Sequence, residues 1–233
     1  VNPQAILKHK GIIANPNCST IIMVMALKPI YDLAKIKRVI VSTYQAVSGA
    51  GKEGIDELDA QVREHSEGRE MTANILPSAS AEKHYPIAFN LIPQIDVFCD
   101  NLYTKEEMKM VNETKKIMED YEMRITATTI RVPVYRSHSE SVNIELEKEV
   151  DLGAMREALA KFPGVTVQDD PSKQEYPMPL YTSEKDDVYV GRLRRDESCE
   201  KSYNMWVVGD QIRKGAALNT LQIAETMIKN GWI

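Results

Sequence analysis

The hydrophobic pattern begins with a short apolar run at residues 11–14. The sequence Asn-Pro-Asn-Cys-Ser-Thr follows at residues 15–20, and a longer apolar stretch occupies residues 21–27. A strand, a tight Asn-Pro turn and a helix fit this order of segments, with Pro29 as a helix breaker further on. The pattern therefore predicts that Cys18 lies in the first turn of a helix.

A strand and an amphipathic helix are predicted next, on either side of a glycine loop. Residues 36–45 are rich in β-branched side chains, which is typical of a strand. They run into the loop at residues 48–51, where glycines permit close backbone approach or a positive φ. Apolar residues then recur among charges at the spacing of a helix that ends near residue 67: Ile55, Leu58 and Val62.

The middle of the chain is irregular up to a well-marked helix start. Residues 68–86 are polar and predict a surface loop. Residues 87–95 are apolar but interrupted by Pro93, which indicates an irregular or edge strand. Thr104 is followed three positions later by Glu107, the spacing of a capping box, so a helix is expected to begin here.

The second half alternates strands and helices at unequal spacing. A polar turn joins two strands, a helix capped by Asp151 follows, and a long loop at residues 168–186 precedes two more strands. The expected strands are 125–134, 141–146, 188–194 and 205–208, and a helix at 212–229 carries Ala217, Leu221, Ala224 and Ile228 on one face. Adjacent strands look hairpin-joined. This organisation predicts an α+β (α/β) fold with a mixed, largely antiparallel sheet covered by helices.

Composition narrows the class of protein. The 233 residues carry a net charge of -5, which argues against nucleic acid as the main partner. The longest apolar run is far too short to span a bilayer, and no charged, apolar leader opens the chain, so we expect no membrane and a cytoplasmic protein. The three cysteines are widely spaced without a CxxC pair, which favours free thiols over disulfides or a metal site.

Cys18 and His138 are the candidate reactive pair. At a helix N-terminus, unpaired N–H groups and the helix dipole favour a thiolate and can receive an oxyanion. A lone cysteine of this kind is nevertheless more often a buried structural residue. Of four histidines, three lie in charged or polar segments, whereas His138 lies at the mouth of a strand pair. On its own it too is more often structural or solvated.

Charged and amide side chains near these segments are further candidates for contact with a substrate. Arg131 or Arg136, close to His138, can fork onto a carboxylate. Glu106 and Lys109 are three apart on a predicted helix and so share a face, although most such pairs are surface ion pairs. Gln45, at a strand end, is able to present an amide to a substrate.

Five ordered motifs then identify a resemblance that runs from the first residues to the last. They are Asn-Pro-Asn-Cys18-Ser-Thr, Thr-Tyr-Gln45-Ala-Val-Ser48-Gly-Ala-Gly, Glu106-Glu-Met-Lys109, Arg131-Val-Pro-Val-Tyr-Arg-Ser-His138-Ser-Glu and Gly-Asp-Gln211-Ile-Arg-Lys-Gly-Ala-Ala. Together they resemble the aspartate-β-semialdehyde dehydrogenase family in its bacterial form. The resemblance implies NADPH-dependent reductive dephosphorylation of L-β-aspartyl phosphate to L-aspartate 4-semialdehyde, a step towards lysine, threonine and methionine.

The resemblance also implies a role for each site residue. Cys18 would form a thioester, Gln45 would orient the acyl group, and His138, with a near-neutral pKa, would be the acid/base. Arg131 would hold the α-carboxylate. The remaining expected contacts are Glu106 to the α-ammonium (Glu107 being the alternative), Lys109 to the phosphate, and Ser48, Gly49 and Gln211 to the nicotinamide end of NADP.

The family's glycine-rich phosphate loop finds no match, because no GxGxxG occurs. We therefore expect a catalytic and dimerisation domain whose Rossmann domain is mostly absent. Residues 1–15 would be a remnant or connector, 16–211 the catalytic and dimerisation domain, and 212–233 a helix that packs on the nucleotide-binding part. NADP binding by this chain alone is expected to be weak, and NAD stays an alternative. A homodimer is expected, with a tetramer open.

Three competing readings are considered. An N-acetyl-γ-glutamyl-phosphate reductase uses similar chemistry but needs no partner for a free ammonium, so the Glu106–Lys109 pair disfavours it. A glyceraldehyde-phosphate type of dehydrogenase places its cysteine in a different local sequence. The third reading takes the chain alone as an inactive dimerisation or substrate-binding module, and this reading is compatible with an active parent enzyme.

Overall fold

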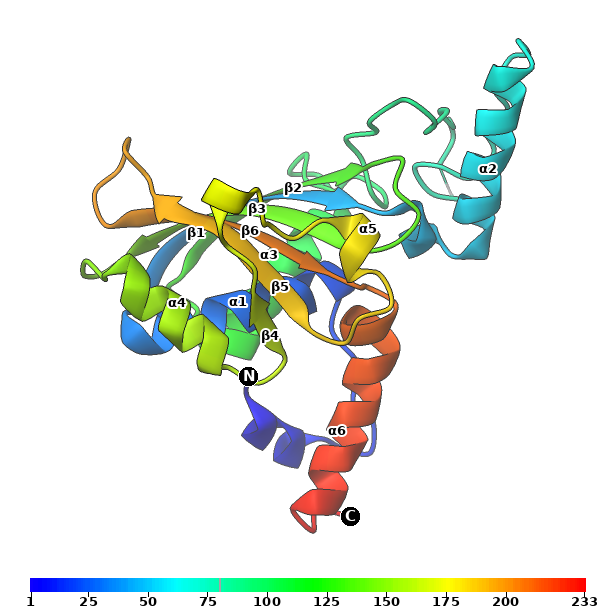
Figure 1. Cartoon of the computed structure of the whole chain (residues 1–233). Coiled ribbons are helices and arrows are strands. Elements are labelled where there is room, and N and C mark those ends of the chain that lie inside the picture. Colours follow the sequence, from blue (N-terminus) through cyan, green and yellow to red (C-terminus); the bar gives the residue numbers. More distant parts are fainter. Residues whose placement is uncertain (80) are drawn as a thin grey trace.

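A mixed β-sheet forms the centre of the molecule (Figure 1). The structure, a computed structural model, describes residues 1–79 and 81–233. In these residues six strands lie in the order β2-β1-β3-β6-β5-β4. Their bounds are β1 (Ile36–Gln45), β2 (Arg124–Arg131), β3 (His138–Leu146), β4 (Val165–Val167), β5 (Val188–Arg195) and β6 (Ser202–Gly209). The β1–β2 and β4–β5 pairs are parallel and the other three are antiparallel, which confirms the predicted fold class.

One expected hairpin is wrong. β2 and β3 follow each other in the chain, yet β1 lies between them, parallel to β2 and antiparallel to β3. The connection at residues 132–137 is long enough to cross the end of β1, and its Val132 N–H donates to the carbonyl of Gln45 (3.0 Å). Crossing one strand spans two strand spacings of about 4.8 Å each, which a tight hairpin turn does not reach. β5 and β6 do form the expected hairpin-like neighbours.

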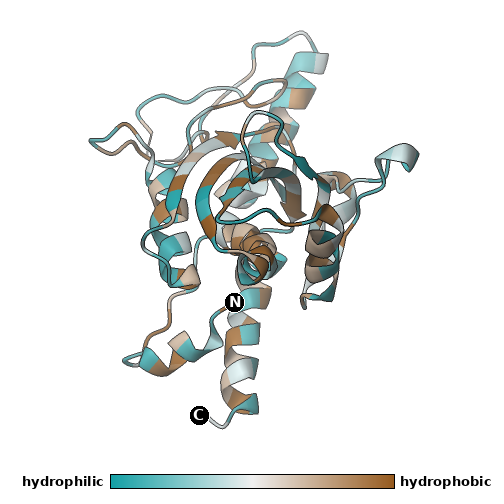
Figure 2. Ribbon diagram, turned by 90° about the vertical axis from the view of Figure 1, so that its left-hand side faces the viewer, coloured by the Kyte–Doolittle hydropathy of each residue, from teal (hydrophilic) through white to brown (hydrophobic). Residues whose placement is uncertain are grey.

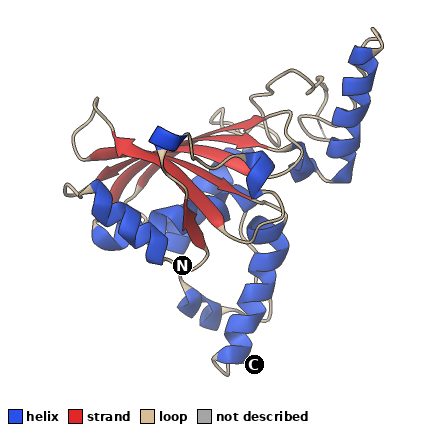
Figure 3. Ribbon diagram, in the orientation of Figure 1, coloured by secondary structure: helices blue, strands red, loops and turns tan. Residues whose placement is uncertain are grey.

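Three helices cover one face of the sheet (Figure 3): α1 (Cys18–Leu33), α3 (Lys105–Met118) and α4 (Leu152–Lys161). α1 is the central one and is apolar on nearly every side (Figure 2), with Ile22, Met23 and Leu27 fully buried. A helix that is apolar all round belongs in a core. Pro29 does not break α1, which continues to Leu33, because burial outweighs the lost hydrogen bond.

α2 (Lys52–Ser66) projects beyond the sheet and anchors an irregular segment through two buried side chains. Glu57 accepts the backbone N–H groups of residues 74–76, and Gln61 accepts those of Ile87 and Ala88. The expected strand at 87–95 is reduced to one bridge between Ile92 and Arg131. The expected loop at 168–186 includes the short helix α5 (Pro179–Thr182).

The two ends of the chain lie side by side below the body, where α6 (Leu218–Lys229) contacts the segment Pro3–Lys8 (Figure 1). A π-helical turn, Arg213–Ala217, precedes α6. The expected strand at 11–14 is wrong: these residues pair with no strand in the described chain, and Ile12 is 87% exposed. The four residues expected on one face of the C-terminal helix are all exposed. Within residues 1–79 and 81–233, no helix has both the length and the apolarity needed to cross a membrane.

Candidate active site

The strand register brings three predicted site residues to one edge of the sheet. Arg131 and Gln45 are paired at the ends of the parallel strands β2 and β1. β3 runs the other way, so its first residue, His138, lies one step beyond the Tyr44–Ser139 pair, opposite Gln45. All three side chains are buried. Arg131, Gln45 and His138 therefore form a row across neighbouring strands.

Cys18 lies at the N-terminus of α1, as predicted. Asn17 is the N-cap residue, and its Oδ1 accepts the N–H of Thr20 (3.1 Å). The turn that leads into α6 closes over Cys18, because a β-carbon added at Gly215 would lie 3.0 Å from the Cys18 β-carbon. Gly215 thus permits close packing between the two segments.

The thiol of Cys18 is protonated in this arrangement, contrary to the expected thiolate. Burial and the Glu106 carboxylate raise the pKa of Cys18 to about 12, against smaller effects of Ser19 and Arg131 that lower it. A helix N-terminus contributes at most about 2 kcal/mol, which is less than the desolvation of a buried anion. The helix dipole alone therefore does not activate this cysteine.

The two candidate glutamates of α3 have different partners. Glu107 completes the capping box, since Thr104 N–H donates to its Oε2 (2.7 Å), and its Oε1 accepts the N–H of Thr129 (2.9 Å). Glu106 instead accepts from Gln45 Nε2 (3.2 Å) and Asn17 Nδ2 (2.8 Å). Glu106 is thus the carboxylate that faces the site, and Glu107 holds the helix to β2.

Lys109 lies at the mouth of the site. Its Nζ is 3.5 Å from Glu106 Oε2 and 3.3 Å from Asp96 Oδ2, and the side chain is 44% exposed. Burial lowers the pKa of Lys109, but Glu106 and Asp96 more than offset that effect and leave it raised. The ammonium is therefore charged and able to meet an anion that enters from solvent.

One backbone residue, Ala46, holds both His138 and Arg131. Its N–H donates to His138 Nδ1 (3.1 Å), and its carbonyl accepts from Arg131 Nη1 (2.7 Å). A ring nitrogen that accepts carries no proton, so the neutral imidazole carries its proton on Nε2, which has no partner in the described chain. Burial and then Arg131 lower the pKa of His138 well below its usual 6.5, so the expected near-neutral value is wrong.

The predicted cofactor residues lie beside His138. Gln211 Nε2 donates to Ser48 Oγ, and Gln211 Oε1 accepts the N–H of Ser137 (2.9 Å). Residue 49 must be a glycine because Arg131 and His138 approach its backbone closely: a β-carbon there would lie 2.6 Å from Arg131 Nη1 and 3.2 Å from His138 Cε1. The Ser48 hydroxyl still has its proton to donate. The donor set and the open surface at Gly49 fit a carboxamide-bearing ring such as nicotinamide.

Sequence reasoning missed three residues that organise the site. Asn17 joins the cap of α1 to Glu106, and the Asn-Cys order was the available signal for it. Asp96 pairs with Lys109 from a distant loop. Asp210 is buried and pairs with Arg136 (2.7 Å), which commits that arginine to structure and leaves Arg131 in the site. No local pattern distinguishes Asp96 or Asp210 from ordinary surface carboxylates.

This fold and site match a family of dehydrogenases. Residues 27–214 match the family model described as semialdehyde dehydrogenase, dimerisation domain. The chain therefore belongs to the semialdehyde dehydrogenase family, in which its named relatives are aspartate-semialdehyde dehydrogenases. It is 54% identical to that of Aquifex aeolicus over 100% of this chain and 67% of the relative, and 51% identical to that of Bacillus subtilis over 98% and 66%.

Solved structures agree with these comparisons. The crystal structure of aspartate semialdehyde dehydrogenase II from Vibrio cholerae has a TM-score of 0.92 and 46% identity, covering 98% of this chain and 66% of that one. The same enzyme complexed with ASA also gives a TM-score of 0.92, at 45% identity. The chain spans about two thirds of the length of the relatives that it matches.

Proposed function

We propose that this chain supplies the catalytic and substrate-binding part of an aspartate-semialdehyde dehydrogenase. The reaction converts L-β-aspartyl phosphate, NADPH and a proton to L-aspartate 4-semialdehyde, phosphate and NADP. The observation that carries the proposal is the meeting of Cys18 with the row Arg131–Gln45–His138 and with Glu106, five buried or half-buried groups from five elements.

Cys18 is the nucleophile in this proposal. Its sulfur attacks the acyl carbon, a C–S bond forms, the bond from carbon to the phosphate oxygen breaks, and the thiol proton leaves on the released phosphate. In this proposal the first N–H groups of α1 and the Gln45 amide would receive the oxyanion. A cysteine suits this step because a thioester accepts a hydride more readily than a carboxylate ester does.

The charged groups match a substrate with one cation and two anionic ends. Arg131 would fork onto the α-carboxylate, since its Nε has no partner among the described residues. Glu106 would meet the α-ammonium, and Lys109 at the mouth would hold the phosphate. This arrangement disfavours an acylated amine, for which a carboxylate partner has no use.

His138 presents an N–H group at Nε2. With its proton held there by the Ala46 contact, the imidazole would donate a hydrogen bond to the oxygen that gains negative charge, and the ring keeps its proton. The proton that balances the reduction comes from solvent and ends on the Cys18 sulfur when the aldehyde leaves. The pKa of His138 lies well below its usual range, so the hydrogen-bond donor is the neutral ring rather than an imidazolium.

NADPH, when bound, would supply the hydride. Ser48 and Gly49 would contact its nicotinamide end, with Gln211 locking Ser48 and the Ser137 backbone beside His138. These residues orient the ring and exclude water at that edge. We expect this chain alone to bind NADP weakly, because none of the proposed cofactor residues, Ser48, Gly49 and Gln211, contacts the adenosine end of the cofactor.

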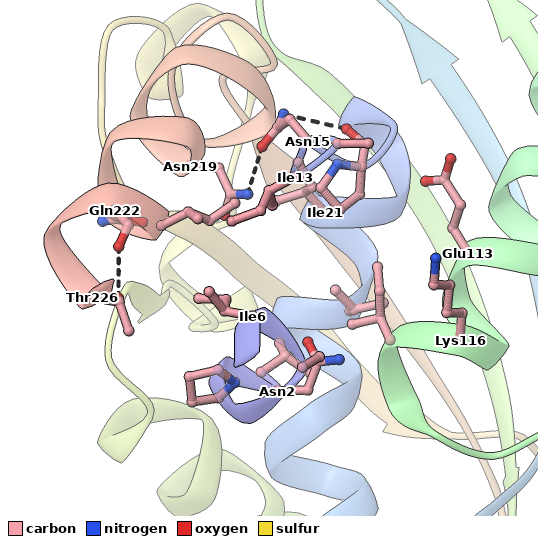
Figure 4. Close-up of a pocket in the computed structure, with 18 of the residues that line it drawn as sticks. Asn2, Ile6, Ile13, Asn15, Ile21, Glu113, Lys116, Asn219, Gln222 and Thr226 are labelled. Carbon is pink, nitrogen blue, oxygen red and sulfur yellow. Dashed lines mark hydrogen bonds between the residues drawn. The ribbon is translucent and has the colours of Figure 1, made fainter. Parts of the chain in front are cut away.

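Residues 1–15 and 212–233 would adjoin the family's nucleotide-binding part. A cleft of about 1220 Å³ lies between the N-terminal segment, α1, α3 and α6 (Figure 4). Ile6, Ile13 and Ile21 line it together with polar residues of α6. We propose that the nucleotide-binding part fills this cleft. The chain would work as a homodimer in the cytoplasm, in the pathway to lysine, threonine and methionine.

The acylation step tests the proposal without the cofactor. We expect β-aspartyl phosphate to leave an acyl adduct on the Cys18 peptide, detected by mass spectrometry, with one phosphate released per adduct. Cys18→Ala should abolish both signals, whereas the exposed Cys199→Ala should leave them unchanged. Adducts spread equally over Cys18, Cys99 and Cys199 would show that Cys18 is not a selective nucleophile, and the proposal would fail.

A further inference from the structure

Glu106 is held by groups of the site itself. One oxygen, Oε1, accepts from both Asn17 Nδ2 (2.8 Å) and Gln45 Nε2 (3.2 Å). The other, Oε2, lies 3.5 Å from Lys109 Nζ, and the residue is only 5% exposed. The Glu106 carboxylate therefore already accepts a hydrogen bond from the Gln45 amide that the substrate would need.

The partners of Glu106 are the groups that serve Cys18. Asn17 caps α1 directly before Cys18, and Gln45 is the amide proposed to receive the acyl oxygen. After burial, the Glu106 charge is the largest cause of the raised Cys18 pKa. Contact geometry and electrostatics thus agree that Glu106 opposes the nucleophile.

We propose that Glu106 couples recognition of the substrate amine to the reactivity of Cys18: an ammonium that pairs with Glu106 removes its negative field from the thiol and releases the Gln45 amide. This inference rests on the proposed function, in which Glu106 meets the α-ammonium. Without an ammonium on Glu106, the thiol would stay protonated and protected. Substrates without the ammonium would be rejected in the chemical step as well as in binding.

The size of the effect follows from thiol chemistry. Each unit by which the pKa of Cys18 falls raises the thiolate fraction about tenfold at pH 8. The intrinsic nucleophilicity of a thiolate falls with its pKa, with a Brønsted coefficient of about 0.4–0.5, so each thiolate reacts roughly threefold more slowly for each unit. Alkylation of Cys18 should therefore accelerate about threefold for each unit.

The first experiment compares iodoacetamide labelling of Cys18 in wild type and Glu106→Gln between pH 7 and 10, by mass spectrometry. We expect at least threefold faster labelling in the variant and a pH profile shifted to lower pH. Glu113→Gln is the matched control, since Glu113 lies on the same helix and accepts the Asn17 backbone N–H (2.7 Å). Its labelling should stay within about twofold of wild type. The rate at half-buried Cys99 reports any loss of folding.

The second experiment adds the amine. L-alanine carries the ammonium and carboxylate but no acyl arm to cover the thiol, and propionate lacks the ammonium. We expect alanine to accelerate Cys18 labelling in wild type and not in Glu106→Gln, and propionate to have no effect on either. Binding of alanine is measured separately by calorimetry.

These outcomes separate the inference from the proposed function. Unchanged labelling in Glu106→Gln overturns the coupling. Alanine that binds wild type through Glu106 without accelerating labelling also overturns it, while the proposed ammonium contact survives. Alanine that binds wild type and Glu106→Gln equally overturns the ammonium contact itself and, with it, the coupling.

Discussion

Replacing Glu107 by glutamine separates the structural carboxylate of α3 from its neighbour in the site. Glu107 is buried and accepts two backbone N–H groups, from Thr104 at the helix cap and from Thr129 on β2. A glutamine keeps one acceptor oxygen and turns an NH2 group towards the other donor. One buried N–H therefore loses its acceptor, and the other loses a charged one.

The expected loss of stability follows from those two contacts. A buried donor without an acceptor costs about 1–3 kcal/mol, and hydrogen bonds to charged groups contribute about 1.5–3 kcal/mol. We expect Glu107→Gln to lower the free energy of unfolding by about 3 kcal/mol. For a chain of this size, that corresponds to a fall in Tm of roughly 6–12 °C.

Urea unfolding followed by circular dichroism measures this difference, with Glu106→Gln as the matched control. Glutamine at 106 retains an oxygen that accepts from Asn17 and Gln45, so its loss should stay below about 1 kcal/mol. The reasoning is refuted if Glu107→Gln unfolds at the same urea concentration as wild type. It is also refuted if the two variants lose stability equally.

Three further predictions concern the row Arg131–Gln45–His138 and the buried Glu140 of β3. Gly49→Ala puts a β-carbon 2.6 Å from Arg131 Nη1, so calorimetry should show L-alanine binding about tenfold more weakly. Its control is Gly51→Ala, where φ is 85° and the space around the residue is open; this variant should lose stability and bind L-alanine as wild type does. Because the pKa of His138 is lowered by burial, its neutral form contributes stability above about pH 6.5 that is lost as pH falls through the folded-state pKa, and His138→Gln should flatten that part of the urea stability profile. ¹⁵N NMR should place the ring proton on Nε2 at pH 7, whereas an imidazolium signal at pH 6.5 would contradict the assignment. Burial raises the pKa of Glu140 well above its usual value, so its stability contribution is present below about pH 4.5 and is lost as pH rises. Glu140→Gln should remove this loss and be more stable than wild type at pH 8, and equal pH dependence of the unfolding free energy in the two proteins would contradict the prediction.

Local sequence was sufficient where local physics decides. The Thr104–Glu107 spacing predicted the capping box, Asp151 predicted a helix start, and β-branched residues predicted β1 with its bounds. Each of these depends on contacts within a few residues, which a pattern records directly. The position of Cys18 at the start of α1 was predictable for the same reason.

Local patterns failed where partners come from far along the chain. Pro29 stays helical because α1 is buried on most sides, and residues 11–14 are not a strand because nothing described pairs with them. The place of β1 between β2 and β3 depends on which strands pair along their edges, and the hydropathy pattern of a strand does not specify its pairing partner. Sequence therefore predicted most elements and the β5–β6 pair, but not the strand that separates β2 from β3.

The site shows the same division. Its residue types and order were legible in the sequence, and their resemblance to a known family supplied the proposed roles. Only the tertiary structure decided that Glu106 faces Gln45 while Glu107 faces Thr129, and that His138 and Cys18 are held uncharged. The physical reason is that orientation and pKa depend on burial and on charges brought together across the chain, whereas helix caps and strand propensities depend on neighbours in sequence.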